Sequence, residues 1–482
     1  MTDSIPQIQD ITDRLPTGRG RQLVCVQGLG FVGAAMATAV AAARRPNGTP
    51  WFDVIGVDLD TPEGRERVGA INRGELPFRT TDLKLLKTIA DAHATGNLHA
   101  TTDSRAYGVA AVILIDVNFD LEHEKGEPKF ALGAFQEALR AVAGHMREDA
   151  LVIVETTVPP GTCARIVAPE LACALELRGL RGDRHLLAHA YERVMPGEQY
   201  LDSIVNFWRV YAGHTAAAAD ACEAFLSKVI DVERFPLRRL HSTTASETAK
   251  VLENSFRAVT IAMMEEWGQF AEAVGVDLFE VISAIRIRPT HSNIRTPGLG
   301  VGGYCLTKDP LFASVAAKSL FERSDIAFSF STRAVETNVR MPVRSVDRLE
   351  SLFPDRGLRG RRLLLLGAAY RPDVGDTRHS PSQIFYEEVR RRGAEVIVHD
   401  PLVRRWKELA VDVLQELPQA RDVDALVFAV GHKEYAAFDF AGWLSGARPH
   451  VLDTSGVLTV AQRAAFRNAG CRVASIGRGD DV

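Results

Sequence analysis

A glycine pattern near the N-terminus constrains the fold of this chain more than any other feature. An apolar run, the glycines and an alanine-rich stretch follow one another: residues 23–27, Gly28-Leu-Gly-Phe-Val-Gly33 and residues 34–43. The run is typical of a buried parallel strand, and alanine favours a helix. In such a unit Gly28 makes the tight turn, Gly30 lets the main chain approach a pyrophosphate, and Gly33 lets the helix pack on the strand. Phe31 and Val32 lie in the glycine loop and are candidate cofactor ligands with it, and the N–H groups at the start of the following helix can bind phosphate. The pattern predicts a dinucleotide-binding α/β domain.

An acidic residue completes this prediction. The next apolar run, residues 53–57, ends at Asp58, about 25 positions after Gly33. A carboxylate there accepts hydrogen bonds from the ribose hydroxyls and repels a 2′-phosphate. We therefore expect NAD, rather than NADP, as the cofactor.

The rest of the chain indicates a second α/β domain and a helical region between the two. At 482 residues the chain is too long for one core. Apolar runs that alternate with helical stretches continue the first sheet and then form another: residues 110–115 and 150–154, then 361–366, 395–399, 425–430 and 451–453. We predict an α/β protein with two doubly wound, Rossmann-like domains joined by a long-helix central domain. The expected divisions are a disordered lead-in, the NAD domain, the central domain and the C-terminal domain: residues 1–20, 21–238, 239–338 and 339–482.

The central region begins with a helical pattern of nearly 30 residues. Thr244 and Glu247 have the spacing of a capping box at its start. Lys250 and Asn254 lie one turn apart on one face, which could line a cleft or simply face solvent. Farther along, we expect one linking helix to end before Pro342 and a shorter one to begin there.

Composition excludes several classes of function. The net charge of -4 argues against nucleic acid or an anionic membrane as the main partner, and no apolar run approaches a membrane span. The first 20 residues lack the hydrophobic core of a signal peptide. The six cysteines are scattered without a C-x-x-C pair, which indicates reduced thiols and no zinc site. We expect a cytoplasmic protein without a metal.

The segment from Gly298 to Pro310 is the strongest candidate for chemistry. Four glycines precede Cys305, and Lys308 and Asp309 follow it. Such a loop can hold a substrate against main chain and present a thiol, and a nearby ammonium favours the reactive thiolate. A glycine-rich turn around an inert, buried cysteine would have the same sequence pattern.

Two further polar segments follow predicted strands. Glu155 and Thr157 end the run at 150–154, on the side of an open α/β sheet where ligands bind. Glu192 and Arg193 begin a loop that reaches Gly197, and a carboxylate beside an arginine suits a binding site. Each segment could equally be a polar turn.

Together these segments resemble the nucleotide-sugar 6-dehydrogenases, the family of UDP-glucose and UDP-N-acetylmannosamine dehydrogenases. The resemblance extends from about residue 23 to 476. It rests on five motifs in the family's order: Gly28-Leu-Gly-Phe-Val-Gly33, Glu155-Thr-Thr-Val-Pro-Pro-Gly-Thr162, Lys250-Val-Leu-Glu-Asn254, Gly302-Gly-Tyr-Cys-Leu-Thr-Lys-Asp309, and Tyr370-Arg-Pro372 with Asp376-Thr-Arg-His-Ser-Pro381.

The resemblance implies an NAD-dependent, four-electron oxidation of the C6 hydroxymethyl of a nucleotide sugar to a uronic acid. Cys305 would form a thiohemiacetal and then a thioester, while Lys250 and Asn254 hold the oxyanion or the water. Glu192 and Asp309 are the candidate carboxylates, and the general base stays open between Lys250, Glu192 and Asp309.

The resemblance also assigns ligand contacts. Arg371 would meet the substrate diphosphate, together with Arg193 and the loop residues Gly302, Gly303 and Tyr304. The implied cofactor ligands besides the glycine loop are these: Asp58, Glu155, Thr157, Lys308 and Arg378. The long helix would build a homodimer or a multiple of dimers.

Departures from the family leave the sugar open. Where many relatives carry Thr-Pro, this chain has Asp116-Val-Asn-Phe-Asp120. The loop from Glu192 to Gly197 is closer to the branch that acts on N-acetylated sugars, whereas Lys308-Asp309 is the UDP-glucose-type ending. The nucleotide, UDP or GDP, is equally open. The alternatives are a two-electron β-hydroxyacid-type dehydrogenase and a non-catalytic NAD- or sugar-binding scaffold.

Overall fold

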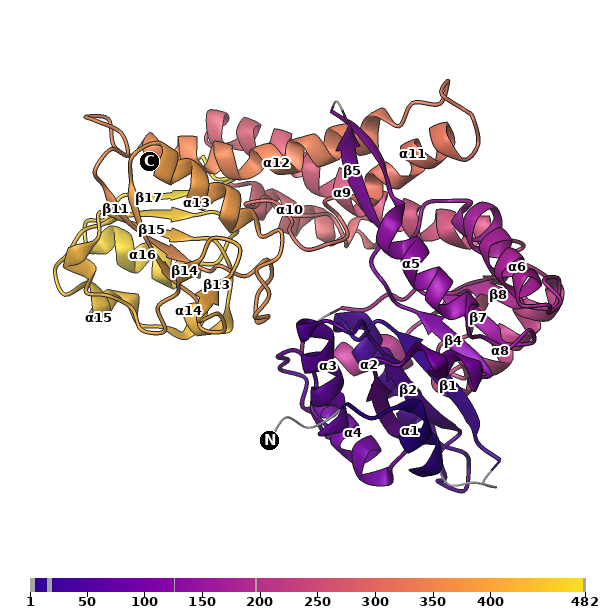
Figure 1. The fold of residues 1–482 in the computed structure, drawn as a ribbon. Coiled ribbons are helices and arrows are strands. Elements are labelled where there is room, and N and C mark those ends of the chain that lie inside the picture. Colours follow the sequence, from indigo (N-terminus) through magenta and orange to yellow (C-terminus); the bar gives the residue numbers. More distant parts are fainter. Residues whose placement is uncertain (1–4, 15–19, 125, 196, 480–482) are drawn as a thin grey trace. The chain divides into compact units, whose positions relative to one another are not determined.

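The chain folds into two compact units. The computed structural model describes residues 5–14, 20–124, 126–195 and 197–479 (Figure 1). The first unit comprises Met1–Leu252 and Phe312–Ala327, and the second comprises Glu253–Leu311 and Phe328–Val482. Residues 1–4 and 15–19 of the expected lead-in, and Pro196 of the loop after Glu192, lie outside the described residues.

An eight-stranded sheet forms the centre of the first unit. Its order is β10-β9-β8-β7-β4-β1-β2-β3, and only β9 and β8 pair antiparallel. The strands are β1 (Gln22–Gln27), β2 (Phe52–Val57), β3 (Leu98–Thr101), β4 (Val112–Ile115), β7 (Leu151–Val154), β8 (Leu186–His189), β9 (Val210–Gly213) and β10 (Arg238–Arg239). A separate hairpin joins β5 (Asp120–Glu124) to β6 (Glu127–Ala131).

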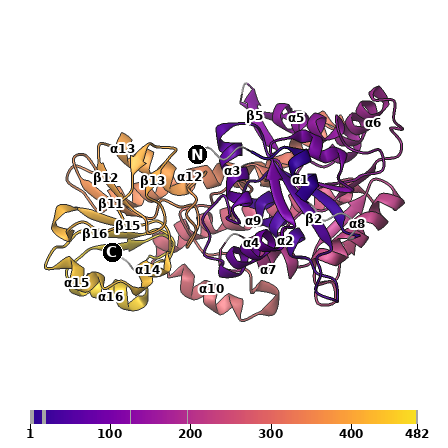
Figure 2. The ribbon, with the colours of Figure 1, turned by 60° about the horizontal axis from the view of Figure 1, so that its bottom comes forward.

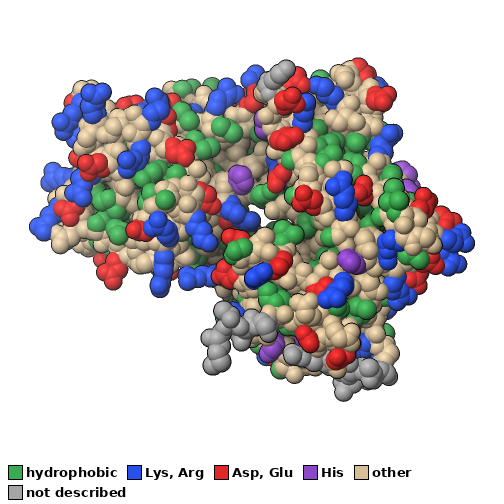
Figure 3. All heavy atoms as spheres, in the orientation of Figure 1, with side chains coloured by type: hydrophobic (Ala, Val, Ile, Leu, Met, Phe, Trp, Pro, Cys, Tyr) green, Lys and Arg blue, Asp and Glu red, His purple; other side chains and the backbone are tan. Residues whose placement is uncertain are grey.

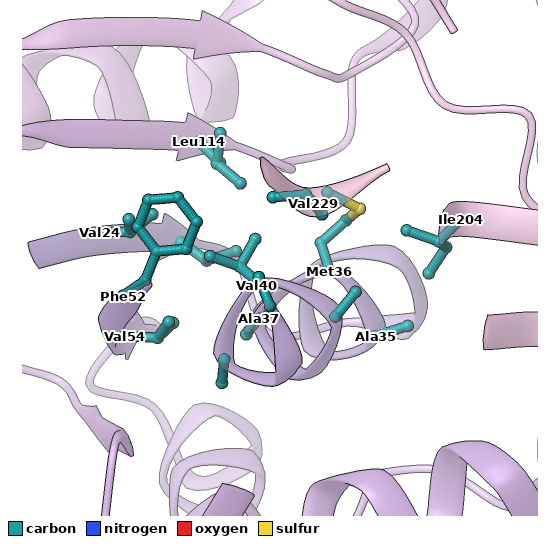
Figure 4. Packing of buried hydrophobic residues seen from close by; sticks show 14 of the residues in the cluster. Val24, Ala35, Met36, Ala37, Val40, Phe52, Val54, Leu114, Ile204 and Val229 are labelled. Atoms are coloured by element: carbon teal, nitrogen blue, oxygen red, sulfur yellow. The ribbon is translucent and has the colours of Figure 1, made fainter. Parts of the chain in front are cut away.

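Helices cover both faces of this sheet, as a doubly wound fold requires. They are α2 (Phe31–Ala42), α3 (Pro62–Asn72), α4 (Leu83–Thr95), α5 (Leu132–Ala143), α6 (Ala168–Leu177), α7 (Tyr200–Val205), α8 (Ala216–Val229) and α11 (Phe312–Ser319), with shorter turns at Ser104–Gly108 and Cys163–Val167. The side chains of β1 alternate: Val24 and Val26 pack with α2, whereas Cys25 packs with α5. Figure 4 shows Val40 of α2 beside Phe52, and Met36 of the same helix beside Val229.

The N-terminal segment differs from the expected disordered lead-in where the structure describes it. Residues Ile8–Arg14 form a helix, α1, whose Ile11 is buried in a core cluster of the first unit. The main-chain N–H of Ile8 donates to Asp103, and the hydroxyl of Thr101 donates to the carbonyl of Pro6. One buried apolar side chain and these hydrogen bonds order a segment whose composition is mostly polar.

A parallel five-stranded sheet forms the centre of the second unit, in the order β12-β11-β15-β16-β17. Its strands are β11 (Arg362–Leu366), β12 (Glu395–His399), β15 (Ala425–Phe428), β16 (His450–Asp453) and β17 (Val473–Ser475). Helix α13 (Pro381–Arg391) covers one face, and α15 (Phe440–Leu444) and α16 (Val460–Asn468) cover the other (Figure 2). Smaller elements are α14 (Lys433–Ala437), Ala420–Asp422, and the pair β13 (Arg405–Trp406) and β14 (Val411–Asp412). This is the predicted second α/β domain.

Long helices make up the central region. They are α9 (Thr243–Val274), α10 (Leu278–Arg286) and α12 (Ser329–Glu350), with short turns at Pro289–His291 and Asp309–Leu311. The expected helix break at Pro342 is wrong, because α12 continues through it. Pro342 is buried there, so packing outweighs the lost main-chain hydrogen bond.

The compact units also differ from a three-domain division of the chain. The first ten residues of α9, Thr243 to Leu252, belong to the first unit, and the rest of the helix belongs to the second. Residues 312–327 return to the first unit, since Phe312 is fully buried in its core. No helix in the described part of the chain is long and apolar enough to cross a membrane. Basic and acidic side chains are interspersed on the face shown in Figure 3.

Candidate active site

The glycine loop after β1 has the geometry of a phosphate-binding turn. Gly28 has a φ of +86°, and a Cβ there would lie 2.7 Å from the carbonyl oxygen of Asp116. A Cβ on Gly33 would lie 1.8 Å from the carbonyl oxygen of Gly28. Gly30 has no atom within 4 Å of its Cβ position, so the main chain is open there to a ligand. The loop therefore fits a dinucleotide pyrophosphate at the N-terminus of α2, as its sequence predicts.

Asp58 lies at the carboxyl end of β2, next to this loop. Its carboxylate accepts hydrogen bonds from the N–H of Leu29 at 2.9 Å and from Arg67 at 2.8 and 2.9 Å. Partial burial raises its pKa, but Arg67 and the main-chain N–H groups of Leu29 and Leu59 lower it overall. Asp58 is thus an ionised carboxylate that Arg67 and two main-chain N–H groups hold in place, and its contact with a ribose stays a prediction. Arg67 lies nine residues later on α3, and no pattern in the sequence predicted its contact with Asp58.

Three carboxylates follow β4, β7 and β8 in the first unit. They are Asp116, Glu155 and Glu192, and the cations beside them are Arg209 and Lys250. The guanidinium of Arg209 lies 3.2 Å from Glu155, and both side chains are buried. Burial and the neighbouring Glu155 and Glu192 raise the pKa of Asp116, and burial raises that of Glu155 to about 7. With three acids and two cations, the cluster retains a proton near neutral pH.

Glu155 therefore lies deeper than its predicted role as a cofactor ligand suggests. Its side chain is 1% exposed and supports the sheet edge through Arg209, which also donates to the carbonyl of Ala190. Thr157 is half-buried in the loop that follows. Arg209 was not predicted, since it lies 54 residues away from its partner in sequence.

Lys250 of α9 is held at the end of β8. Its ammonium donates to the carbonyl of Glu192 at 2.7 Å, lies 3.4 Å from that carboxylate, and stands over the ring of Tyr191. On the same helix, Ser246 bonds the buried ring of His189 at 2.8 Å. Burial lowers the pKa of His189 to about 3, so the ring next to Lys250 is neutral. Arg193, a predicted substrate ligand, donates to Tyr191 and to the carbonyl of Trp208.

The capping box expected at Thr244 and Glu247 is not formed. The two carboxylate oxygens of Glu247 accept the main-chain N–H groups of Gly161 and Cys163, at 2.6 and 2.7 Å. Ser242 instead accepts a hydrogen bond from Ala245 in the first turn of α9. A tertiary partner has replaced the local one, and the helix is thereby fixed to the loop after β7.

In the second unit, Cys305 stands on a loop braced by a buried acid. Asp309 is fully buried, and its carboxylate accepts from the Asn254 amide at 2.8 Å and the Lys308 ammonium at 2.9 Å. The main-chain N–H groups of Asp309 and Lys308 both donate to the carbonyl of Cys305. The thiol-bearing side chain is exposed. The predicted set Cys305, Asn254, Lys308 and Asp309 is therefore brought together.

The glycines before Cys305 pack against the C-terminal motif. A Cβ on Gly302 would lie 2.4 Å from the carbonyl of His379, and one on Gly303 would lie 2.9 Å from the ring of Tyr370. The ring of Tyr304 makes an edge contact with His379 at 5.6 Å. Two motifs that are separated in sequence thus form one surface of the second unit.

The guanidinium of Arg257 interacts electrostatically with Cys305 and with two further arginines of this unit. Desolvation lowers the pKa of Arg257, as do the neighbouring guanidiniums of Arg295 and Arg371, while Cys305 raises it. Only Arg371 was predicted. Arg257 follows Asn254 by three residues on α9, which could have indicated the shared face. Such a group can bind an anion and favour a thiolate.

Two further side chains of the second unit make polar contacts: Arg378, which was predicted, and Asn338, which was not. Arg378 forms an ion pair with Asp376 at 2.7 Å, and its contact with the cofactor stays a prediction. The Asn338 side chain of α12 bonds both the N–H and the carbonyl of Val301, at 2.7 Å each. Asn338 clamps the glycine loop, although nothing in the sequence pattern indicated it.

Comparison with known proteins adds the deciding observation. Three family models match in order: the NAD binding domain of the UDP-glucose/GDP-mannose dehydrogenase family over residues 22–229, its central domain over 244–339 and its UDP binding domain over 364–460. The chain belongs to this family. It is an NAD-dependent nucleotide-sugar dehydrogenase, and the predicted fold class and cofactor are confirmed.

Individual relatives of this dehydrogenase are similar along nearly their whole length. UDP-N-acetyl-D-mannosamine dehydrogenase of Methanocaldococcus jannaschii is 30% identical, over 95% of this chain and 97% of that one. NDP-N-acetyl-D-galactosaminuronic acid dehydrogenase of Ralstonia nicotianae is 28% identical, over 92% and 97%. The structure of UDP-D-ManNAc dehydrogenase from Pyrococcus horikoshii has a TM-score of 0.78 and 28% identity, over 95% and 100%.

Proposed function

We propose that the chain oxidises the C6 hydroxymethyl of a UDP-N-acetylhexosamine to the carboxylate, with Cys305 as the covalent catalyst. The observation that carries this is the bracing of the exposed Cys305 by buried Asp309, which also holds Asn254 and Lys308. The N-acetylated sugar is proposed because the relatives above carry such names and because the loop after Glu192 is closer to that branch.

The proposed reaction has four steps: oxidation, addition of the thiol, a second oxidation and hydrolysis. Removal of a hydride and a proton converts the alcohol to the aldehyde, and the Cys305 sulfur adds to its carbonyl carbon as a thiohemiacetal. Removal of a second hydride and a proton gives the thioester. Water cleaves this to the carboxylate and restores the thiol. NAD, when bound, accepts each hydride, so each sugar yields two NADH.

Residues of the chain supply binding and proton movement. Asn254, oriented by Asp309, and Lys250, one turn earlier on α9, would donate hydrogen bonds to the oxyanion as charge develops on C6. Glu192 holds the Lys250 ammonium, so we propose this pair for the exchange of protons with the substrate.

Arginines of the second unit would bind the diphosphate of the substrate. Arg371 is proposed for this role together with Arg257 and Arg295, since Arg257 interacts with Cys305 and with both other guanidiniums, and a guanidinium fork matches phosphate oxygens. For the cofactor we propose main-chain contacts from the loop of Gly28 to Gly33.

The test is an absorbance screen of NADH formation over a panel of UDP- and GDP-sugars. We expect two NADH per sugar and the uronate as product. Cys305→Ala should lower uronate formation by several orders of magnitude and leave at most one NADH per sugar, with aldehyde as the residual product. A variant that still makes carboxylate near the wild-type rate would refute the covalent role. One NADH per sugar in the wild type would favour the two-electron dehydrogenase.

We also propose a homodimer, or a multiple of dimers, that works in the cytoplasm. Large apolar side chains of α9 are exposed on the single chain, among them Phe256, Trp267 and Phe270, each more than half exposed. A second copy would bury this stripe, and symmetric pairing is the common case. For a reducing compartment, the support is that none of the six cysteines forms a disulfide.

A further inference from the structure

A hollow lies at the amino ends of the strands of the second sheet. Its volume is about 510 Å³, and its lining includes the residues that precede or begin four strands: Arg361, Asp424, His450 and Arg472. The strands are parallel, so their amino ends share one edge. The carboxyl ends, where an open α/β sheet binds its nucleotide-type ligand, form the opposite edge. The hollow is therefore separate from the expected substrate site of this unit.

Positive charge in the hollow exceeds negative charge. Four arginines and two aspartates line it: Arg361, Arg421, Arg448, Arg472, Asp355 and Asp424. Both aspartates pair with Arg361, at 2.8 and 3.4 Å. Arg472 donates at 3.4 Å to the carbonyl of Leu352, and neither Arg421 nor Arg448 has a hydrogen-bonded or acidic partner among the described residues. Three guanidiniums thus face the hollow without a compensating carboxylate.

One wall of the hollow is a packed aromatic surface. The rings of Phe353 and His450 have centroids 4.5 Å apart, and the Arg361 guanidinium lies 4.7 Å from the centre of the Phe353 ring. The Nδ1 atom of His450 and the Nε atom of Arg361 are buried, and neither has a hydrogen-bond partner in the described structure. Burial, Arg472 and Arg361 lower the pKa of His450, so the ring is neutral and the excess charge resides on the arginines.

We propose that this hollow binds a small anion that carries two or more phosphate groups. Its volume is in the range of small-molecule sites. Guanidinium forks bind phosphate oxygens in pairs, and a concave surface of one charge concentrates such anions. The proposal goes beyond the dehydrogenase reaction and does not depend on the identity of the sugar.

The test is calorimetric titration of the full chain with inorganic tripolyphosphate, in the presence of saturating NADH. The variant is Arg448→Gln with Arg472→Gln, and the matched control is Arg404→Gln, an exposed arginine elsewhere in the same unit. We expect the wild type and the control to bind alike and the double variant to bind at least about tenfold more weakly, because each lost contact to a charged group costs about a factor of ten. Since both replaced side chains are exposed, thermal unfolding should be unchanged.

Three results would overturn the proposal. They are equal binding by wild type and double variant, equal weakening in the Arg404→Gln control, and no binding by the wild type at millimolar tripolyphosphate. If the wild type binds no tripolyphosphate and forms an oligomer, while light scattering shows that the double variant is monomeric, the arginines form an interface between copies of the chain instead. A second titration with a nucleoside triphosphate identifies the source of the phosphate groups. Tighter binding than tripolyphosphate would place a base against Phe353 and His450.

Discussion

The carboxyl group of Glu247 connects helix α9 to the loop after β7. Both its oxygens are used, since they accept the N–H groups of Gly161 and Cys163. The side chain is fully buried, and burial raises its pKa from 4.5 to about 7, against the lowering effect of these hydrogen bonds. Lys250 follows one turn later on α9, so the position of the carboxyl group also affects the predicted active site.

We predict that Glu247→Gln destabilises the first unit by about 1–3 kcal/mol at pH 5. Both oxygens of the protonated carboxyl group can still accept an N–H, whereas the amide nitrogen of glutamine cannot and leaves one N–H buried and unpaired. The measurement is urea denaturation of both proteins. Wild-type stability in the variant would show that the two hydrogen bonds contribute little.

The stability difference between the wild type and Glu247→Gln should depend on pH, in a direction that the pKa shift of Glu247 fixes. Because the pKa is raised on folding, the folded chain binds a proton that the unfolded chain loses between pH 4.5 and about 7. The contribution of this group to stability is complete below pH 4.5 and falls as pH rises through 7. The advantage of wild type over Glu247→Gln should therefore be smaller at pH 8 than at pH 5, and an equal or larger difference at pH 8 would contradict this.

Sequence reasoning found the side chains that belong to compact motifs. Cys305, Lys308 and Asp309 share one loop, and Asn254 meets them from a helix whose spacing was visible. Partners joined only by the tertiary fold were missed, as with Asn338. The expected capping box was wrong for a related reason: a Glu at that spacing suits a cap, and the nearby N–H groups of another loop displaced the local partner.

Helix α12 holds the cysteine loop by hydrogen bonds from the Asn338 side chain. The Asn338 amide donates to the Val301 carbonyl and accepts from its N–H group, and a Cβ on Gly300 would lie 3.1 Å from its oxygen. We predict that Asn338→Ala lowers kcat/KM about ten- to a hundredfold, since two main-chain groups lose their partner and the loop loosens.

Asn338→Asp, which keeps the acceptor and loses the donor, should fall between the alanine variant and the wild type. Thermal unfolding of the three proteins controls for loss of the fold. Unchanged kcat/KM in the alanine variant would mean that the loop is positioned without α12.

Helix α9 presents the apolar stripe proposed for self-association. Trp267 and Phe270 are 51% and 57% exposed and contact each other edge to face. We predict that Trp267→Glu with Phe270→Glu converts the oligomer to monomers, because two carboxylates would be buried against apolar surface. Light scattering at micromolar concentration measures this. Trp267→Tyr, which keeps an aromatic ring, should stay oligomeric, and a monomeric wild type would refute the interface.

The elements themselves were predictable to different degrees. Continuous apolar runs identified half of the first sheet and most of the second, because buried parallel strands have few polar positions. The predicted strands are β1, β2, β4, β7, β11, β12, β15 and β16, whereas β3, β8, β9, β10 and β17 were not predicted. The continuity of α12 through Pro342 was not predictable, since buried packing there opposes the local preference of proline. For α1, Ile11 is buried and Ile8 packs partly buried against the same core, and two apolar residues are too few to give a clear periodicity.

The division of the molecule into units depends on a contact that is distant in sequence. Phe312 is fully buried in the core of the first unit, where its ring meets that of Phe119 edge to face at 5.7 Å. The pattern of strands and helices gave the two α/β halves. It gave no reason to assign residues 312–327 to the N-terminal half, because such packing leaves no local pattern.

We predict that Phe312→Ala destabilises the first unit by about 3–5 kcal/mol, as expected for a large ring removed from a core. Urea denaturation of the full chain should show this loss. Phe330→Ala is the control, because its side chain is 80% exposed and its removal should cost little. Equal small effects for both variants would mean that residues 312–327 are peripheral to the first unit.

The split composition of the first unit has a consequence for how the protein is made. A ribosome releases the chain from its N-terminus, and domains generally fold as they emerge. Here the N-terminal sheet emerges long before Phe312, so its core stays incomplete while residues 253–311 are still being translated. The nascent sheet must persist with an open apolar site until the later segment arrives. Chains whose synthesis stops between residues 252 and 312 would therefore expose that site, and they would be natural clients of chaperones and proteases.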